Sequence, residues 1–184
     1  MDIRFETERL VLRTLMKEDA PALLDYFSRN ADFLEPWEVK RDASFYTLES
    51  MNTLVEDETT ALKAGHTLRL WITPKHNTNR IIGSVALSNI IRGAFQSSFI
   101  GYRLDEKEIN RGIMAEAITE MVEIAFEKLH LHRVEANIIP RNKASIRTVE
   151  KVGFKYEGIS PKYLKINDVW EDHIHMVILN ESLE

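Results

Sequence analysis

The sequence has 184 residues, of which 44% are hydrophobic and 29% charged, as is usual for one folded globular domain. Its formal net charge of −5 argues against a nucleic-acid-binding surface, and the lack of cysteine excludes disulfides, a thiolate nucleophile and cysteine-ligated metal sites. The N-terminus lacks the basic and apolar segments of a signal peptide, and no apolar run approaches the ~20 residues of a membrane span, so we expect a cytoplasmic protein.

The N-terminal third of the chain predicts a strand and two helices. Residues 6–15 alternate leucine with arginine, which is the pattern of a half-buried strand. Asp19 is expected to cap a first helix, and a second helix begins at Asp42 or Ser44. The apolar residues of the second helix recur on one face, and Gly65 follows its last turn, where glycine commonly ends a helix.

The remainder of the chain predicts strands and two further helices. The predicted elements are strands His66–Lys75, Arg80–Ile91 and Ala94–Leu104, a helix from Arg111 to about Leu129, a strand Arg133–Pro140, a helix Lys143–Val152, and strands Phe154–Leu164 and Asp168–Leu179. We find no internal repeat or linker. The pattern predicts a single α/β domain over residues 1–184, with a mixed, mostly antiparallel central sheet of about seven strands flanked by four helices.

The long helix begins at a candidate anion site. Its first turn presents backbone N–H groups that have no partner inside the helix, and these add to the positive end of the helix dipole. Gly112 has no side chain and lets an anion approach the backbone, while Arg111 adds a positive charge. Many helices begin after a glycine, so this segment alone does not identify a phosphate site.

A second informative helix start contains Asn142 and Ser145. An asparagine at such a position usually caps the helix, and a serine in the first turn commonly bonds the backbone. The functional interpretation places both side chains over a cleft between the strand before the long helix and the strand before this short one. Ligands of α/β sheets favour such clefts at the carboxyl ends of parallel strands.

Six short motifs run through nearly the whole chain. In order, they are TERLxLR at residues 7–13, LxPW at 34–37, GIMAEA at 112–117, LHRVEAN at 131–137, NxxS at 142–145 and GFxxEG at 153–158. As a set, they resemble the GCN5-related N-acetyltransferase (GNAT) superfamily, and within it the branch of ribosomal-protein alpha-amino acetyltransferases. Only Gly112 matches the general pyrophosphate-loop pattern of the superfamily, whereas Gly-Ile-Met is a variant of that branch.

The resemblance implies a splayed parallel strand pair at the centre of the sheet, with acetyl-CoA in the splayed cleft. Pantetheine would pair with strand residues 100–104, and pyrophosphate would lie on the N–H groups of residues 111–115. The implied cofactor-binding residues are Ile100, Tyr102, Arg103, Leu104, Asn110, Arg111, Gly112, Ile113, Met114, Ala115 and Asn142. Ser145 would be catalytic and protonate the leaving thiolate, because Val149 occupies the position of the tyrosine that many superfamily members use.

The implied reaction is direct attack of a neutral amine on the thioester. An α-amino group has a pKa of roughly 7.7–8.0 and lysine one near 10.4, which favours a protein N-terminus as acceptor, such as that of a basic ribosomal protein. Phe33 and Trp37 would line the acceptor pocket, although a hydrophobic staple between helices explains them as well. A small-molecule amine (polyamine, amino acid or antibiotic) is an alternative acceptor. A non-catalytic acyl-CoA-binding module also remains open, because no residue is identified as the general base.

Other features have simpler interpretations. His173 and His175 share one strand face, where an exposed pair is favoured over a metal site because no third ligand is evident. Acidic residues are frequent in residues 31–65, which is usual for a solvated helix face but would also attract a basic acceptor. Edge strands near the C-terminus favour a homodimer or a higher homo-oligomer. We expect no metal, no nucleic acid and no membrane among the partners.

Overall fold

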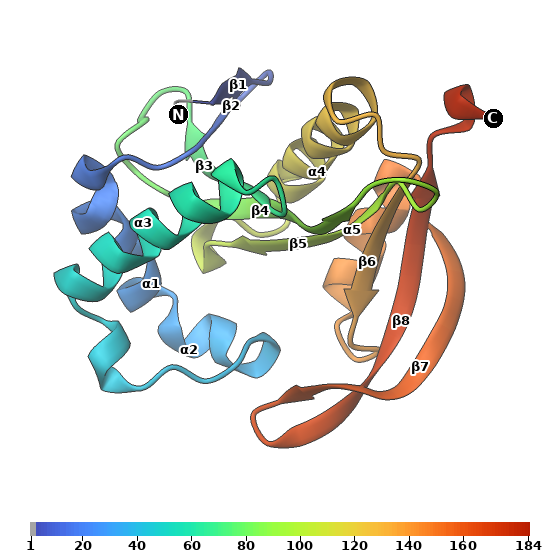
Figure 1. Ribbon diagram of the computed structural model, residues 1–184. Helices are drawn as coiled ribbons and strands as arrows, with labels where there is room; N and C mark the ends of the chain where they lie inside the picture. The colour runs from blue at the N-terminus through green and yellow to red at the C-terminus, as the bar shows by residue number, and fades with distance from the viewer. Residues whose placement is uncertain (1–2) are drawn as a thin grey trace.

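The computed structural model describes residues 3–184, which form one mixed, eight-stranded sheet flanked by helices (Figure 1). The strand order is β1-β2-β3-β4-β5-β6-β8-β7. The strands are β1 (Arg4–Glu6), β2 (Leu10–Arg13), β3 (Leu68–Pro74), β4 (Gly83–Ile91), β5 (Ser97–Leu104), β6 (Arg133–Ile138), β7 (Lys155–Ile166) and β8 (Val169–Leu179). The α-helices are α1 (Ala20–Arg29), α2 (Ala31–Leu34), α3 (Leu48–Lys63), α4 (Ile113–Glu123), which continues as one π-helical turn (Ile124–Lys128), and α5 (Lys143–Val152).

The predicted α/β class and mixed sheet are confirmed, but each predicted element count is one short. The single strand predicted over residues 6–15 is instead the hairpin β1–β2, in which Phe5 faces Leu12. The reversal is stabilised by the Thr7 hydroxyl, which accepts a hydrogen bond from the backbone N–H of Leu10 at 3.1 Å. The additional helix is α2, whose four residues are too few to give a hydrophobic period.

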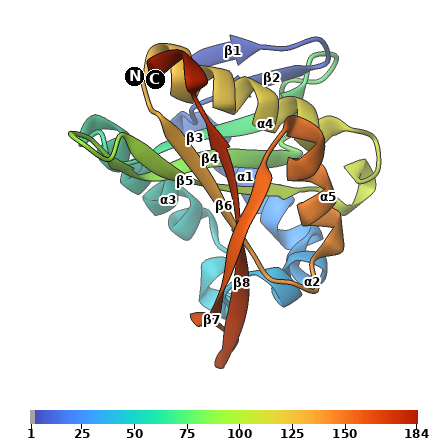
Figure 2. The same cartoon turned by 90° about the vertical axis from the view of Figure 1, so that its right-hand side faces the viewer.

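Helices cover both faces of the sheet (Figures 1 and 2). The reason is visible in strand β3, whose successive side chains point to opposite faces of the sheet and enter two separate hydrophobic cores. Leu70 and Ile72 pack into the core that contains the buried residues of α4. Trp71 packs into the other core, where its ring meets Tyr26 of α1 edge-on at 5.8 Å. Apolar residues on both sides of one strand therefore require α1 and α3 on one face and α4 and α5 on the other.

The parallel pair at the centre of the sheet is splayed, as predicted. Strands β5 and β6 pair only where residues 97–99 face residues 133–135. Beyond that point β5 continues beside β4, β6 continues beside β8, and the two strands diverge (Figure 1). The backbone of residues 100–104 therefore has a strand neighbour on one edge only.

The β7–β8 hairpin is long and folds back toward the N-terminal helices (Figure 1). At its tip, Asn167 accepts a hydrogen bond from the backbone N–H of Lys40 and donates one to the carbonyl oxygen of Glu35, both at 2.8 Å. The interpretation of His173 and His175 as an exposed pair is wrong, because the ring of Tyr163 on β7 packs on both imidazoles and His173 is only 3% exposed. Among the described residues, no helix is long and apolar enough to cross a membrane.

Candidate active site

A cleft of about 680 Å³ opens between the diverging strands β5 and β6. It brings together most of the predicted site residues, namely Phe33, Trp37, Ile100, Tyr102, Arg103, Leu104, Asn110, Gly112, Ile113, Met114, Ala115, Asn142 and Ser145. Arg111 is the exception. Its side chain is 62% exposed and turns away to form an ion pair with Glu108 at 2.5 Å, so only its backbone remains at the start of α4.

Helix α4 begins at the cleft with an uncapped first turn. Gly112 is the N-cap residue and has a left-handed backbone with φ of 74°, a conformation that glycine adopts without steric cost. Within residues 3–184 no side chain caps this end, so the N–H groups of the first turn and the positive end of the helix dipole face the cleft. This arrangement is suited to binding a phosphate or pyrophosphate group.

The first turn of α4 is anchored by Glu116 to the β1–β2 hairpin. Its carboxylate accepts hydrogen bonds from the Thr7 hydroxyl at 2.5 Å, the Arg9 backbone N–H at 2.9 Å and the Arg9 side chain at 2.6 Å. Burial works to raise the pKa of Glu116, but these contacts together outweigh it and hold the pKa below its ordinary value of 4.5. Arg9 also donates to the carbonyl oxygen of Arg111 at 2.9 Å, which fixes the residue before Gly112.

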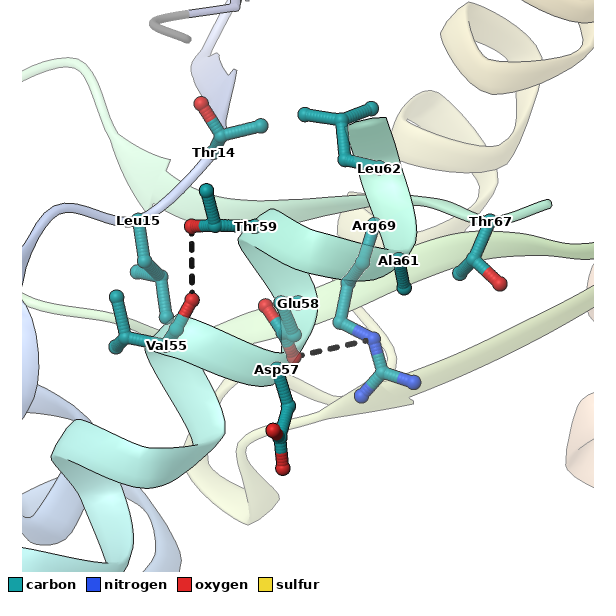
Figure 3. Close-up of a pocket in the computed structure, with 10 residues that line it drawn as sticks. All are labelled: Thr14, Leu15, Val55, Asp57, Glu58, Thr59, Ala61, Leu62, Thr67 and Arg69. Carbon is teal, nitrogen blue, oxygen red and sulfur yellow. Dashed lines mark hydrogen bonds and ion pairs between the residues drawn. The ribbon is translucent and has the colours of Figure 1, made fainter. Parts of the chain in front are cut away.

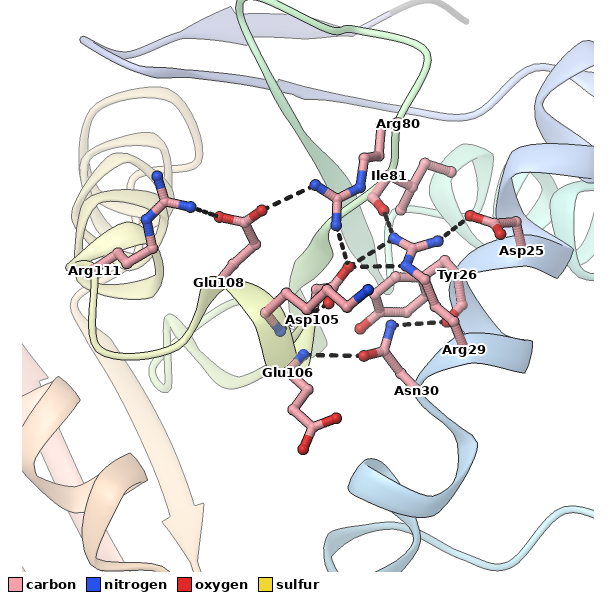
Figure 4. A network of polar contacts seen from close by, with 11 residues as sticks. Asp25, Tyr26, Arg29, Asn30, Arg80, Ile81, Asp105, Glu106, Glu108 and Arg111 are labelled. Carbon is pink, nitrogen blue, oxygen red and sulfur yellow. Dashed lines mark hydrogen bonds and ion pairs between the residues drawn. The ribbon is translucent and has the colours of Figure 1, made fainter.

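A network of ion pairs supports the loop before α4 (Figure 4). Asp105, at the end of β5, is almost fully buried and pairs with Arg29 of α1 at 2.8 Å and with Arg80 at 3.0 Å. Arg80 also pairs with Glu108 at 3.0 Å, and Glu108 holds Arg111. This chain of alternating charges links α1 to the start of α4, so the candidate anion site is positioned by contacts within the protein.

The start of α5 places Ser145 against Tyr102. Asn142 caps the helix, as expected on position alone, because its side-chain oxygen accepts from the backbone N–H of Ser145 at 3.1 Å. The Ser145 hydroxyl does not bond the backbone but lies 2.6 Å from the hydroxyl of Tyr102. Burial raises the pKa of Tyr102 to about 12, so this phenol is protonated at neutral pH. Val149 is fully buried and contributes no polar group.

Sequence reasoning missed the side-chain role of Tyr102, since it assigned this residue to the cleft through its backbone. One signal was available. Ile100 and Tyr102 are separated by one residue on β5, so their side chains point to the same face of the sheet. If the side chain of Ile100 lines the cleft, the side chain of Tyr102 is expected to line it as well. The hydroxyl partner on α5 could not be inferred from that spacing.

The opposite side of the cleft holds aromatic and charged residues. Phe33 and Trp37 line the cleft, and Phe33 also packs against the core under α1, so the pocket and staple interpretations both describe it. The carboxylate of Glu38 pairs with Arg41 at 2.5 Å and with Arg103 at 3.2 Å. Burial lowers the pKa of Arg103, although the nearby Glu38 carboxylate opposes this shift.

The comparisons with known proteins agree with this geometry. A family model described as an acetyltransferase (GNAT) domain matches residues 9–155. The chain belongs to the GNAT acetyltransferase family. This GNAT chain is 42% identical over 175 residues to the probable N-acetyltransferase YjcK of Bacillus subtilis (strain 168), an alignment that covers 95% of the chain and 96% of the relative. The chain is therefore an acyltransferase that acts on an amine.

Two solved GNAT structures are similar over nearly the full chain. One is the ribosomal-protein-S5-alanine acetyltransferase from Vibrio fischeri, with a TM-score of 0.91, 35% identity and 100% coverage of both chains. The other is RimJ of Mycobacterium smegmatis in complex with CoA-disulfide, with a TM-score of 0.88, 27% identity, and coverage of 95% of this chain and 83% of that one.

A smaller cavity of about 210 Å³ lies between α3 and β3 of the GNAT fold (Figure 3). Glu58 forms an ion pair with Arg69 at 3.4 Å and accepts a hydrogen bond from the Trp71 indole at 2.8 Å, but Glu58 Oε1 and Arg69 Nε have no hydrogen-bond partner among the described residues. Burial raises the pKa of Glu58, and both partners oppose that shift. We assign no chemistry to this cavity. Among the described residues, no group of histidine and acidic side chains is arranged to hold a metal ion.

Proposed function

We propose that residues 1–184 act as one GNAT domain that transfers the acetyl group of acetyl-CoA to the α-amino group of a protein N-terminus, with a ribosomal protein as the favoured acceptor. The observation that carries the proposal is the cleft itself. A strand edge without a neighbour and an uncapped helix start open onto the same space, as binding a long molecule with a pyrophosphate requires.

The residues of the cleft fit acetyl-CoA. The free edge of residues 100–104 offers N–H and C=O groups to the amides of pantetheine, which would extend the sheet by one strand. The first turn of α4 offers its N–H groups to the pyrophosphate. The CoA complex of the Mycobacterium smegmatis relative supports this assignment.

The chemistry follows from the contact between Tyr102 and Ser145. A thiolate leaves when the C–S bond of the thioester breaks, and it is a better leaving group when it receives a proton. The Ser145 hydroxyl lies at the start of α5 and is hydrogen-bonded to a phenol that is protonated at neutral pH. We assign Ser145 as the proton donor to sulfur, with Tyr102 replacing the proton.

The acceptor assignment has two supports. An α-amine loses its proton more readily than a lysine side chain by roughly 2–3 pKa units, so it needs less help from the enzyme. The relative from Vibrio fischeri is described as acting on an alanine of ribosomal protein S5. The acidic segment 31–65 gives weaker support than its composition suggests, because Glu38, Glu56 and Glu58 are each paired with basic residues.

The test uses three versions of one basic peptide with an N-terminal alanine: unmodified, blocked at the α-amine, and with its lysines blocked. We expect thiol release from acetyl-CoA with the first and third peptides, and mass spectrometry should place the acetyl group on the N-terminus. Spermidine, free amino acids and an aminoglycoside serve as competing acceptors. Faster turnover with any of these, or acetylation of lysine alone, contradicts the proposal.

A further inference from the structure

The mechanism above lacks a residue that takes the proton from the acceptor, and the cleft contains a suitable imidazole. His173 on β8 lines the cleft and is 3% exposed. Its Nδ1 lies 3.1 Å from the backbone carbonyl oxygen of Glu171. A carbonyl oxygen can only accept, so Nδ1 carries the hydrogen and donates it, which leaves Nε2 with a free lone pair. This Nε2 hydrogen-bonds to none of the residues that the structure describes.

The two carboxylates of the cleft are less suited to this task. Glu38 pairs with both Arg41 and Arg103, and Glu108 pairs with both Arg80 and Arg111. Either carboxylate would have to break an ion pair to accept a proton, whereas His173 would not.

A second polar group shares the face of the sheet on which His173 lies. Asn137 on β6 lines the cleft, and its side-chain oxygen is buried without a hydrogen-bond partner among the described residues. Asn137 pairs directly with His175, so His173, two residues away on β8, is its diagonal neighbour. Diagonal neighbours of an antiparallel pair have Cβ atoms roughly 7 Å apart, close enough for both side chains to reach one small group.

We propose that His173 is the general base of the acetyl transfer and that Asn137 binds the acceptor nitrogen. Both residues line the cleft, and each has an acceptor with no donor among the described residues: the buried side-chain oxygen of Asn137 and Nε2 of His173. An ammonium group supplies three donors. A buried acceptor without a partner is costly, so the site is complementary to an amine that enters as a cation. The inference rests on the proposed function only in requiring an amine acceptor.

Nε2 of His173 takes one proton from R–NH₃⁺, and the freed lone pair forms the N–C bond with the thioester carbonyl carbon. The C–S bond then breaks and its electron pair leaves on sulfur, which takes a proton from Ser145. Ser145 regains its proton from Tyr102, and the second proton that the nitrogen loses passes through water to Tyr102. The first proton passes from His173 to water, so one proton is released for each amide and CoA thiol formed.

The charged and polar groups near His173 come from four elements. They are Glu135 on β6, held by His175 at 2.7 Å, Tyr163 on β7, and Glu38 with Arg103 across the cleft. The last two form an ion pair and largely cancel each other's charge. The base is therefore tested through the charge of the substrate, which can be changed without altering any of these groups.

The experiment compares His173→Asn with the wild-type protein on two peptides that differ only at the N-terminus, alanine or trifluoroalanine. The asparagine amide reproduces the donation by Nδ1 but removes Nε2. Fluorine keeps the α-amine neutral at pH 7, so the second peptide needs no base to become nucleophilic. We expect kcat/KM to fall about 100-fold with the alanine peptide and less than 5-fold with the trifluoroalanine peptide. The KM for acetyl-CoA should change less than 2-fold.

Two further variants separate this role from a structural one. His175→Gln, on the same strand face but outside the cleft, should reduce kcat/KM equally for both peptides. Asn137→Ala should raise the KM for the alanine peptide about 10-fold with little change in kcat, and it keeps the inference testable if His173→Asn does not fold. Equal losses on both peptides for His173→Asn, or none, would overturn the assignment of the base. If the wild-type protein acetylates none of the peptides, the result would instead contradict the proposed function.

Discussion

Replacing Ser145 with alanine is the most direct test of the chemistry in the cleft. The change removes the hydroxyl that lies 2.6 Å from the phenol of Tyr102 and leaves the Asn142 cap in place, because that cap uses the backbone N–H of Ser145. Loss of a proton donor typically costs at least 100-fold in rate, which corresponds to about 2.7 kcal/mol of transition-state stabilisation. We therefore expect kcat to fall about 100-fold, while the KM for acetyl-CoA changes less than 2-fold.

The same substitution has a separate effect on stability. It leaves the half-buried phenol of Tyr102 with only a long contact of 3.4 Å to the Ser145 carbonyl oxygen, and the loss of the better partner costs about 1–2 kcal/mol. For a chain of this size, Tm should fall by about 2–6 °C. The double variant Ser145→Ala/Tyr102→Phe removes both partners and should recover most of that loss without recovering activity.

The assay is thiol release from acetyl-CoA under saturating acceptor, together with thermal unfolding of the single and double variants. A kcat within 2-fold of the wild-type value would refute the assignment of Ser145 as the donor and would make it a helix-start residue only. A double variant that is less stable than Ser145→Ala would refute the reasoning about the orphaned phenol.

Three further predictions concern the elements that position the cleft. Glu116→Gln should cost about 1–2 kcal/mol at pH 7 in urea unfolding. Because the folded-state pKa of Glu116 lies below 4.5, this stabilisation is present above pH 4.5 and is lost as pH falls through the folded-state value. The unfolding free energies of wild type and variant should therefore become equal in acid. A constant difference between them down to pH 3 argues against the ionised anchor. Gly112→Ala should cost about 1–2 kcal/mol, because alanine is strained at a φ of 74°, and should weaken acetyl-CoA binding about 10-fold in calorimetry; unchanged affinity would separate this helix start from the pyrophosphate. Gly83→Ala should lower the free energy of unfolding by about 2–3 kcal/mol, because the alanine Cβ would lie 2.5 Å from the carbonyl oxygen of Arg103. A melting temperature equal to that of the wild type would show that β4 and β5 can move apart to make room for it.

Much of the fold and of the site could be predicted because it is encoded locally. The period of two from β3 to β5, and the start of α4 at Gly112, depend on residues close together in the chain. Asn142 was predicted as a helix cap on position alone, and the structure shows that cap. The splayed strand pair came instead from the family resemblance, since no pattern in either strand specifies where pairing stops.

The parts that could not be predicted depend on contacts between distant residues. The β1–β2 reversal has no glycine or proline, and a threonine hydroxyl stabilises it, so the sequence pattern continues through it as one strand. Arg111 is expected from the sequence to add its positive charge to the anion site. In the structure its guanidinium instead forms an ion pair with Glu108, three residues earlier. His173 was interpreted as exposed because the strand pattern does not show that Tyr163, ten residues earlier on another strand, covers it.

The hairpin of β7 and β8 also connects the two walls of the cleft. Its tip is fastened by Asn167 to the segment that carries Trp37 and Glu38, so the acceptor side is bridged from one wall to the other. For the proposed protein acceptor, this connection would favour a free N-terminus over an internal lysine, because a chain end can pass beside it more easily than a loop that is held at both ends.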